Sequence, residues 1–379
     1  MAYQVTQSAI QRINHVTTRP IDRLPVEILV EIFSFAGSAD DVHSLLLTSK
    51  KLYAAYIKNA NRIAKAHIFR LLDPSDYKLA VMAIESRNVN PLDQTSLQRF
   101  FDDYIHHEEW GIKLFRMRTV SRLPELINAI SYIVETLNES PGTRLKRDMG
   151  PTPGENARKT RAYYMQEVSL NLFNRMPGEE GHWILSTPNK DWMTKYWANF
   201  SPGEIAQAKL VRCFWYRWHL YDVQLCSEFR MHLPPLSSTM MTGSQLQAIL
   251  YTQLCGIRII SHWVRPTRSG VLSVAKDWSQ FTNQATREEI DSMCSSLHQQ
   301  ITDCVREAEQ LGNPCFHQDP ESISDEVWDM RDNEWNKYSD IDVFDNEGHM
   351  GGFSHRVIYD KSTVAKVRQL AAKVKELSV

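Results

Sequence analysis

The residues that most resemble a metal site are His106, His107, Glu108 and Glu109, which follow one another directly. Imidazole and carboxylate groups are metal ligands, but a two-histidine site on a helix needs the histidines four residues apart. Consecutive residues on a helix point about 100° away from one another. The sequence therefore predicts a solvated polar face at this segment and no metal centre.

Other patterns that carry chemistry are also missing from the sequence. The segment from Asp340 to Gly348 has the carboxylates of a calcium loop, but its glycine and closing glutamate are out of register. No Gly-x-Ser-x-Gly nucleophile turn and no glycine-rich phosphate or dinucleotide loop occurs. We therefore expect no catalytic residue, no metal and no cofactor. An enzyme whose residues converge only in the fold remains open as an alternative.

The cysteines show no spacing that favours zinc binding or redox chemistry, because no pair has the Cys-x-x-Cys pattern. The start of the chain has no apolar segment of the kind that directs secretion. We expect reduced, mostly buried thiols in a cytoplasmic or nuclear protein. The six residues are Cys213, Cys226, Cys255, Cys294, Cys304 and Cys315.

Length and charge limit the class of protein. A chain of 379 residues with 42% hydrophobic and 23% charged residues has the composition of a globular protein of two or three domains. Its formal net charge of -2 argues against nucleic-acid binding, which requires a basic excess to displace counterions from phosphate. The sequence has no apolar run of about 18 residues or more, so it predicts no membrane span.

The hydrophobic pattern is helical along most of the chain, and no repeat of fixed period occurs. Apolar residues recur at steps of three and four, which predicts helices with one buried face. Two clear stripes are Leu97, Phe100, Phe101, Tyr104 and Ile105, and Leu126, Ile130, Ile133 and Leu137. We predict an all-α protein in which three N-terminal helices precede a large irregular helical domain.

Proline and glycine mark the expected boundaries. Residues 140–156 hold three prolines and three glycines without an apolar period, which predicts a flexible loop. Ser201 and Glu204 have the spacing of a capping box, which starts a helix. We divide the chain into a flexible arm (1–18), the three-helix segment (19–60), a first helical block (61–139), the loop (140–156) and a second helical region (157–379).

The tail has an unusual order of charges, with an acidic stretch at 319–347 ahead of a basic helical run at 361–378. One interpretation is that the basic helix packs back on the domain and pairs with the acidic stretch. The other is that the acidic stretch binds a partner. Surface charge pairs by themselves would add little stability.

The segment from Leu24 to Ile57 is the most informative part of the chain. Pro25 is tolerated where a first helix begins, because its missing N–H would be unpaired there. Gly37 is expected to end that helix, and Ser38 with Asp41 has the spacing of a cap that starts a second one. Three short helices cannot bury all their apolar residues internally, so part of this surface should meet another protein or the following block.

This segment resembles an F-box. Leu24, Pro25, Glu27, Ile28 and Ile32 match the Leu-Pro-x-Glu-Ile/Leu-x-x-x-Ile pattern of that family, and Leu45, Leu46 and Ser49-Lys50-Lys51 match its second half. The sequence departs from the family at Ala36, Thr48 and Leu52, where a large aliphatic residue, Val and Trp are common. A box ahead of a long helical region without repeats also resembles many F-box proteins of fungi.

The resemblance implies a function in protein recognition. F-box proteins bind a Skp-type adaptor, which joins them to a cullin scaffold in an SCF ubiquitin ligase, and they recruit the protein to be ubiquitinated. The expected adaptor-binding residues are Leu24, Pro25, Glu27, Ile28, Ile32, Leu45, Leu46, Ser49 and Lys50. The alternatives are an adaptor-binding or scaffold protein outside any ligase, and a segment that only begins an ordinary helical domain.

A dense aromatic region between Trp192 and Tyr221 is expected to be mostly core, because several of its residues share one helix face. The remaining side chains are of the types enriched at binding hot spots. We therefore predict a substrate-binding surface formed by Trp192, Trp197, Arg212, Tyr216 and His219.

Overall fold

The computed structural model describes residues 20–73, 76–106, 115–139, 150–173 and 190–201, and the short helical pieces 203–205, 207–208, 211, 303–304, 307–308, 362, 365–366 and 369. These residues are 83% helical and contain no strand, which confirms the all-α prediction. Among them, no helix has the length and apolarity needed to cross a bilayer. The flexible arm, the acidic stretch and most of the loop at 140–156 lie outside the described residues.

The chain divides into two compact units, with divisions after Tyr77, Glu108 and Pro124. The first unit comprises Met1–Tyr77 and Glu109–Pro124, and the second comprises Lys78–Glu108 and Glu125–Val379. Helix α7 (Met117–Glu139) belongs to both units.

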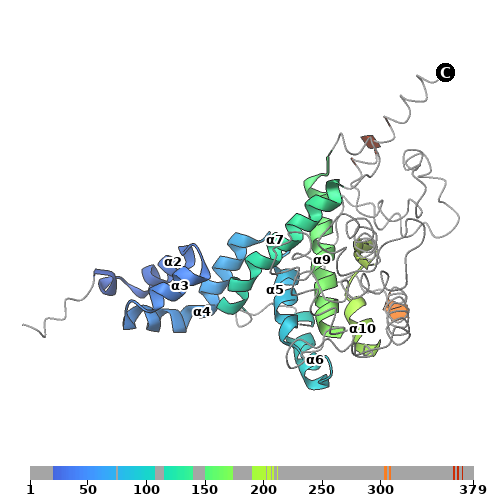
Figure 1. The fold of residues 1–379 in the computed structure, drawn as a ribbon. Helices are drawn as coiled ribbons and strands as arrows, with labels where there is room; N and C mark the ends of the chain where they lie inside the picture. The colour runs from blue at the N-terminus through green and yellow to red at the C-terminus, as the bar shows by residue number, and fades with distance from the viewer. Residues whose placement is uncertain are drawn as a thin grey trace, which may run out of the picture. The chain divides into compact units, whose positions relative to one another are not determined.

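Besides the start of α7, the first unit contains a short 3-10 helix (Pro20–Arg23) and helices α2 (Val26–Phe35), α3 (Ala39–Leu46) and α4 (Lys50–Leu71), shown in blue in Figure 1. Helices α2 and α3 both pack against α4. The side chains at their interface are fully or nearly fully buried and form one hydrophobic core. This core contains Leu29, Val30, Phe33, Val42, Leu52, Ala55 and Ile63.

Serine caps set the two turns between these helices. The Ser38 hydroxyl accepts a hydrogen bond from the Asp41 backbone N–H at 3.1 Å, which confirms the predicted start of α3. The Ser49 hydroxyl accepts from the Leu52 backbone N–H at 3.1 Å and caps α4 in the same way. Helix α2 ends at Phe35 with Ala36 as its cap, and Gly37, the predicted stop, follows directly.

The C-terminal end of α2 is held by two side chains of α4. His67 Nε2 lies 2.8 Å from the Phe33 carbonyl oxygen, and Arg70 donates to the Ala36 carbonyl at 2.7 Å. Arg70 also lies 2.8 Å from His67 Nδ1. Because a guanidinium can only donate, Nδ1 must accept, and His67 is therefore neutral with its proton on Nε2. These bonds add side-chain partners to carbonyls at the helix end, where the intrahelical pattern of hydrogen bonds stops. The Phe33 carbonyl also accepts from the Ala36 backbone N–H at 3.2 Å.

We expect acid to destabilise the first unit through His67. Burial is the main cause that lowers the pKa of this imidazole below its ordinary value of 6.5, and the charge of Arg70 acts in the same direction. At neutral pH the imidazole is uncharged in the folded and unfolded states. As the pH falls below about 6.5, the unfolded chain binds the proton first, so stability is lost until the folded pKa is reached.

The measurement is the thermal midpoint of the unmodified chain and of His67→Gln between about pH 7.5 and about pH 5.5. The midpoint of the unmodified chain should fall more steeply, because glutamine keeps a donor and an acceptor but does not titrate. The other histidines are common to both proteins and cancel in the difference. Parallel curves would contradict the prediction.

The second unit contains the C-terminal part of α7 and further helical elements. These include α5 (Tyr77–Glu85), α6 (Gln94–Phe100), a π-helix η3 (Phe101–Ile105), α9 (Pro153–Phe173) and α10 (Lys190–Trp197). The first residue of α5, Tyr77, still belongs to the first unit. All five residues of the predicted stripe on α6 and η3 are buried, as are Leu126, Ile130 and Ile133 on α7. Helix α7 starts at Met117, earlier than its apolar stripe indicated, and continues through Pro124.

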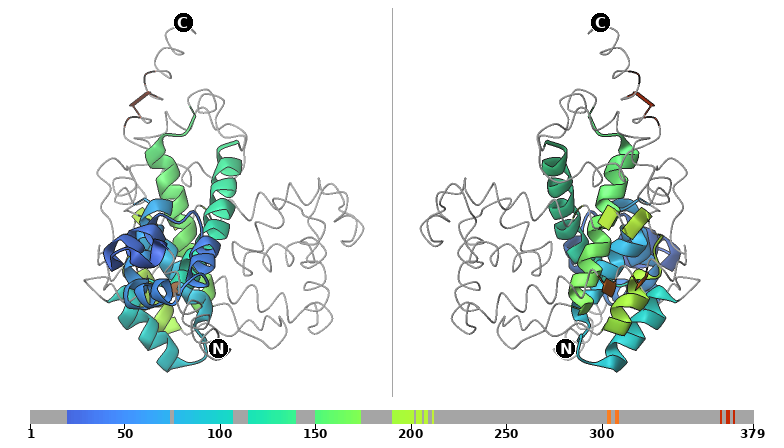
Figure 2. Two further views of the ribbon diagram at one scale, coloured as in Figure 1. Left: turned by 90° about the vertical axis from the view of Figure 1, so that its left-hand side faces the viewer. Right: turned by 90° about the vertical axis from the view of Figure 1, so that its right-hand side faces the viewer.

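Helix α9 begins at Pro153, inside the segment expected to be a flexible loop. Thr152 and Glu155 form a reciprocal capping box, in which each side chain accepts from the backbone N–H of the other, at 3.1 and 3.3 Å. Figure 2 shows α9 beside the C-terminal part of α7, where Lys159 donates to the Asn138 amide oxygen. The predicted box at Ser201 and Glu204 is confirmed, with bonds of 2.9 and 3.2 Å.

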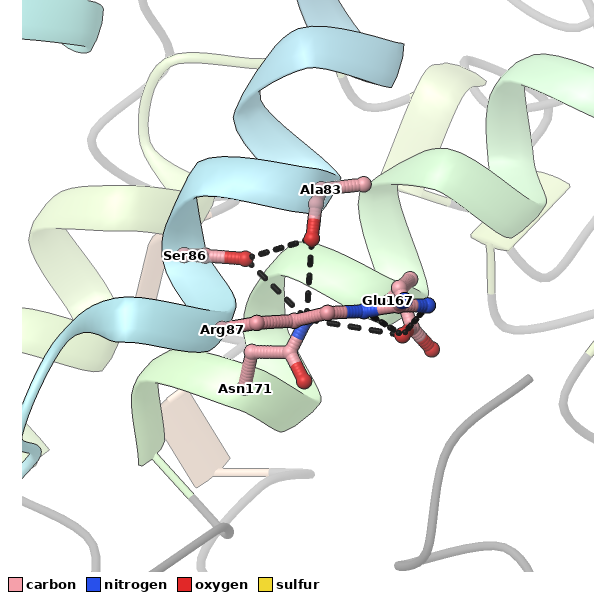
Figure 3. A network of polar contacts seen from close by, with 5 residues as sticks. All are labelled: Ala83, Ser86, Arg87, Glu167 and Asn171. Atoms are coloured by element: carbon pink, nitrogen blue, oxygen red, sulfur yellow. Dashed lines mark hydrogen bonds and ion pairs between the residues drawn. The ribbon is translucent and has the colours of Figure 1, made fainter. Parts of the chain in front are cut away.

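A buried polar network joins α9 to α5 and to the short 3-10 helix η2 (Ser86–Asn88) that follows it (Figure 3). Arg87 donates from two nitrogens to Glu167 Oε1, at 2.8 and 3.2 Å. Asn171 donates to the Ala83 carbonyl and to the Ser86 hydroxyl, both at 3.1 Å. Burying these groups is tolerable because each one has a partner of opposite polarity.

We expect Glu167→Ala to lower the free energy of unfolding by about 3–5 kcal/mol, because it leaves the Arg87 guanidinium without its buried partner. Urea unfolding followed by far-ultraviolet circular dichroism measures this change. The matched control in the same unit is Glu307→Ala, which breaks the exposed ion pair between Lys190 and Glu307. The control should leave the unfolding midpoint nearly unchanged. Equal effects of the two variants would show that the Glu167 network does not hold the helices together.

Candidate functional site

Helix α2 has apolar residues on two opposite sides. Leu29, Val30 and Phe33 face the core, whereas Ile28 and Phe35 lie on the outer side and are 47% and 74% exposed. Ile28 and Phe35 are seven residues apart, which places them on one helix face two turns from each other. An exposed apolar face of this kind on a short helix is typical of a surface that another protein covers.

The rest of the first unit adds to this exposed apolar surface. Leu47, directly after α3, is 76% exposed, and Tyr53 and Ile57 are exposed one turn apart on α4. Of the nine large hydrophobic side chains that are exposed in the described residues, six lie between positions 26 and 57. We call these six the apolar surface set. They are Val26, Ile28, Phe35, Leu47, Tyr53 and Ile57.

Four of the residues predicted to bind an adaptor are exposed, namely Pro25, Glu27, Ile28 and Lys50. The others have a structural role in the first unit. Leu24, Ile32, Leu45 and Leu46 are partly buried and pack against the hydrophobic core, and Ser49 caps α4. The motif residues therefore combine fold-forming positions with surface positions, and only the second kind is fully available to a partner.

Phe35 and Leu47 were not among the predicted residues, although they are the most exposed large hydrophobic side chains in the described part of the chain. For Phe35 a signal was present, because its spacing from Ile28 and Ile32 continues a helical stripe. Leu47 gives no such signal. It follows two leucines that pack on the core, and its exposure depends on where α3 ends.

Two departures from the family pattern take part in the internal packing of the first unit. Leu52 is fully buried between the helices, and Ala36 packs against the same hydrophobic core. Thr48 is exposed, and its hydroxyl donates to the Leu45 carbonyl at 2.7 Å, which helps to close the turn after α3. The changes at positions 36 and 52 thus alter internal packing more than the exposed face.

Trp197 does not belong to a surface, which corrects one part of the predicted substrate-binding set. Its side chain is 1% exposed and packs edge to face against Tyr196, with ring centroids 5.2 Å apart. Tyr196 donates to the Met165 carbonyl at 2.9 Å, and burial, followed by the charge of Glu204, raises the pKa of its hydroxyl well above the usual range. Aromatic residues here fill the core because together they exclude water.

Trp192 is partly exposed and lines an open depression between α10 and the helices α6 and η3. It is the one residue of the predicted substrate-binding set that the described part of the chain places on a surface. Arg212, Tyr216 and His219 lie outside the described residues. Of the six cysteines, the described residues include Cys304, which is buried and not in a disulfide.

Comparison with known proteins identifies the segment that carries the apolar surface set. The family model described as F-box-like matches residues 21–58. No curated protein and no solved structure matches the chain. The match supports the F-box resemblance, and the narrower resemblance to F-box proteins of fungi is not shown by it.

We expect two phenylalanines of α2 to differ sharply in their effect on stability. Phe33→Ala removes a fully buried ring and should lower the free energy of unfolding by about 3–5 kcal/mol. Phe35→Ala removes an exposed ring and should change it by about 0.5 kcal/mol or less. Urea unfolding of both variants checks the prediction. A large loss with Phe35→Ala would mean that this ring supports the fold and is not available to a partner.

Proposed function

We propose, on the premise that residues 21–58 are an F-box-like domain, that this chain is a substrate receptor of an SCF ubiquitin ligase. The F-box binds a Skp-type adaptor, the adaptor connects it to a cullin scaffold, and the remainder of the chain holds the protein to be ubiquitinated. The chain itself is a non-catalytic subunit that acts in the cytoplasm or nucleus.

The observation that carries this proposal is the coincidence of the family match with the apolar surface set. All six of its side chains fall within the matched residues. Moving one large apolar side chain from water into a packed interface contributes about 1.5–3 kcal/mol to the free energy of binding. A few such residues, close to the centre of an interface, usually supply most of the binding energy.

A receptor of this kind accelerates ubiquitin transfer by position alone. Holding the target and the conjugating enzyme on one scaffold turns an encounter between two proteins into an effectively intramolecular step. No acid, base or nucleophile from the receptor is needed for that gain. The chain therefore needs one surface that binds the adaptor stably and another that binds the target.

The proposal predicts that the chain forms a stable complex with a Skp-type adaptor and that the Phe35→Gln/Leu47→Gln variant loses it. The dissociation constant should rise by about 100-fold or more, because two large apolar side chains are no longer buried. Glutamine keeps the helix and both positions are exposed, so the variant should fold normally. Co-expression, size exclusion and calorimetric titration measure the effect.

The matched control is Leu92→Gln, which removes another exposed leucine, outside the F-box. It should bind the adaptor like the unmodified chain. If the unmodified folded chain does not bind an adaptor, or if the double variant binds as well as the control, the receptor proposal fails. Co-purification of a cullin with the complex then separates a ligase receptor from an adaptor-binding protein that acts outside a ligase.

A further inference from the structure

The second unit has an open depression of about 520 Å³ that the F-box does not use. Polar side chains of α6 and η3 form one side, and Trp192 of α10 forms the other. Its charged residues are Arg99, Asp102 and Asp103. Among the lining residues, two carboxylates outnumber one guanidinium beside an aromatic ring.

Trp192 is held in place by its neighbours. Its ring centroid lies 4.7 Å from that of the buried Phe101. The Lys195 ammonium, one turn along α10, lies 4.5 Å from the Trp192 ring centroid. A tryptophan ring attracts a cation through the negative charge of its π face. The ring already holds the Lys195 ammonium, so an incoming cation would take the place of this side chain on the ring.

The π-helix determines where the two carboxylates lie. The His106 backbone N–H donates to the Phe101 carbonyl five residues earlier, at 2.9 Å, which adds one residue to the turn. Asp102 accepts from the Gln98 amide at 2.7 Å. Asp103 makes no ion pair with another described residue. Single π-helical turns within helices are frequent at functional sites.

We propose that this depression binds an arginine side chain presented by an extended segment of another protein. A guanidinium is planar and can stack on a tryptophan ring while its N–H groups pair with a carboxylate. Lysine has a compact ammonium that cannot do both. A phosphorylated segment does not fit, because Asp102 and Asp103 would repel its charge.

As a target-binding site, the depression rests on the proposed receptor function, but the binding itself can be measured without an adaptor. The second unit would then recognise a short basic segment of the recruited protein while the F-box is held by the ligase. Trp192 provides apolar contact area, and the carboxylates select a positively charged side chain. The site belongs entirely to the second unit, so its geometry does not depend on how the two units are arranged.

The test uses the full chain with 15N-labelled tryptophan side chains, and Trp192→Phe assigns the indole N–H signal of Trp192. The probes are the blocked peptide Ala-Arg-Ala and the same peptide with citrulline, which is nearly isosteric with arginine but uncharged. The arginine peptide should shift the Trp192 signal in a saturable way, and the citrulline peptide should require about tenfold more for the same shift. Equal effects of the two peptides would overturn the proposal.

Variants separate the site from general electrostatics. Asp103→Asn should weaken arginine-peptide binding by about tenfold, and Arg99→Gln should strengthen it, because a repelling charge is removed. The control Asp191→Asn removes a carboxylate next to Trp192 in the sequence that does not line the depression, so it should have no such effect. If Asp103→Asn and Asp191→Asn behave alike, the assignment is wrong.

Adaptor binding shows which of the two proposals fails. Asp103→Asn should bind a Skp-type adaptor as tightly as the unmodified chain does, because Asp103 lies outside the F-box. If the unmodified chain binds the adaptor but shows no effect of the arginine peptide, the arginine site is rejected and the receptor function stays intact. Loss of adaptor binding in the unmodified chain, with the peptide effect retained, would reject the receptor function and leave the site.

Discussion

The packing of α2 against α4 is the contact on which the first unit depends. Only one side of α2 can be buried there, and Leu29, Val30 and Phe33 occupy it. The residues on the opposite side of α2 are then left uncovered, since α3 also packs on α4. The exposure of Ile28 and Phe35 is therefore a consequence of the fold, and it presents the apolar face that the proposed function uses.

This contact extends past the segment that the F-box-like family describes, which ends at residue 58. Helix α4 has a non-helical residue at Asn59, whose side chain donates to the Ala55 carbonyl, and it continues as a helix to Leu71. His67 and Arg70, beyond that point, hold the last carbonyls of α2. The second half of α4 is thus part of the support for the F-box, and a truncation at residue 58 would leave that end of α2 without these partners.

Local signals in the sequence predicted local structure well. The cap at Ser38, the box at Ser201 and the apolar stripe on α6 depend on residues within a few positions of one another, and all three are confirmed. Exposure was harder to predict. Trp197 and Trp192 are of one type and five residues apart, yet one is core and the other lines a depression. The difference comes from which neighbours reach them, and for Trp192 these include Phe101, which is distant in sequence.

Glu204 makes one contact that the sequence predicts and another that it does not. Its spacing from Ser201 identifies a capping box, and one carboxylate oxygen does accept from the Ser201 backbone N–H. The other oxygen pairs with the buried Arg161 of α9 at 2.7 Å, a contact that no local pattern indicates. The cap fixes the carboxylate at a helix start, and that fixed charge offsets the desolvation cost of burying a guanidinium on a neighbouring helix. One residue therefore satisfies a local rule and a tertiary requirement, and only the first can be read from the sequence.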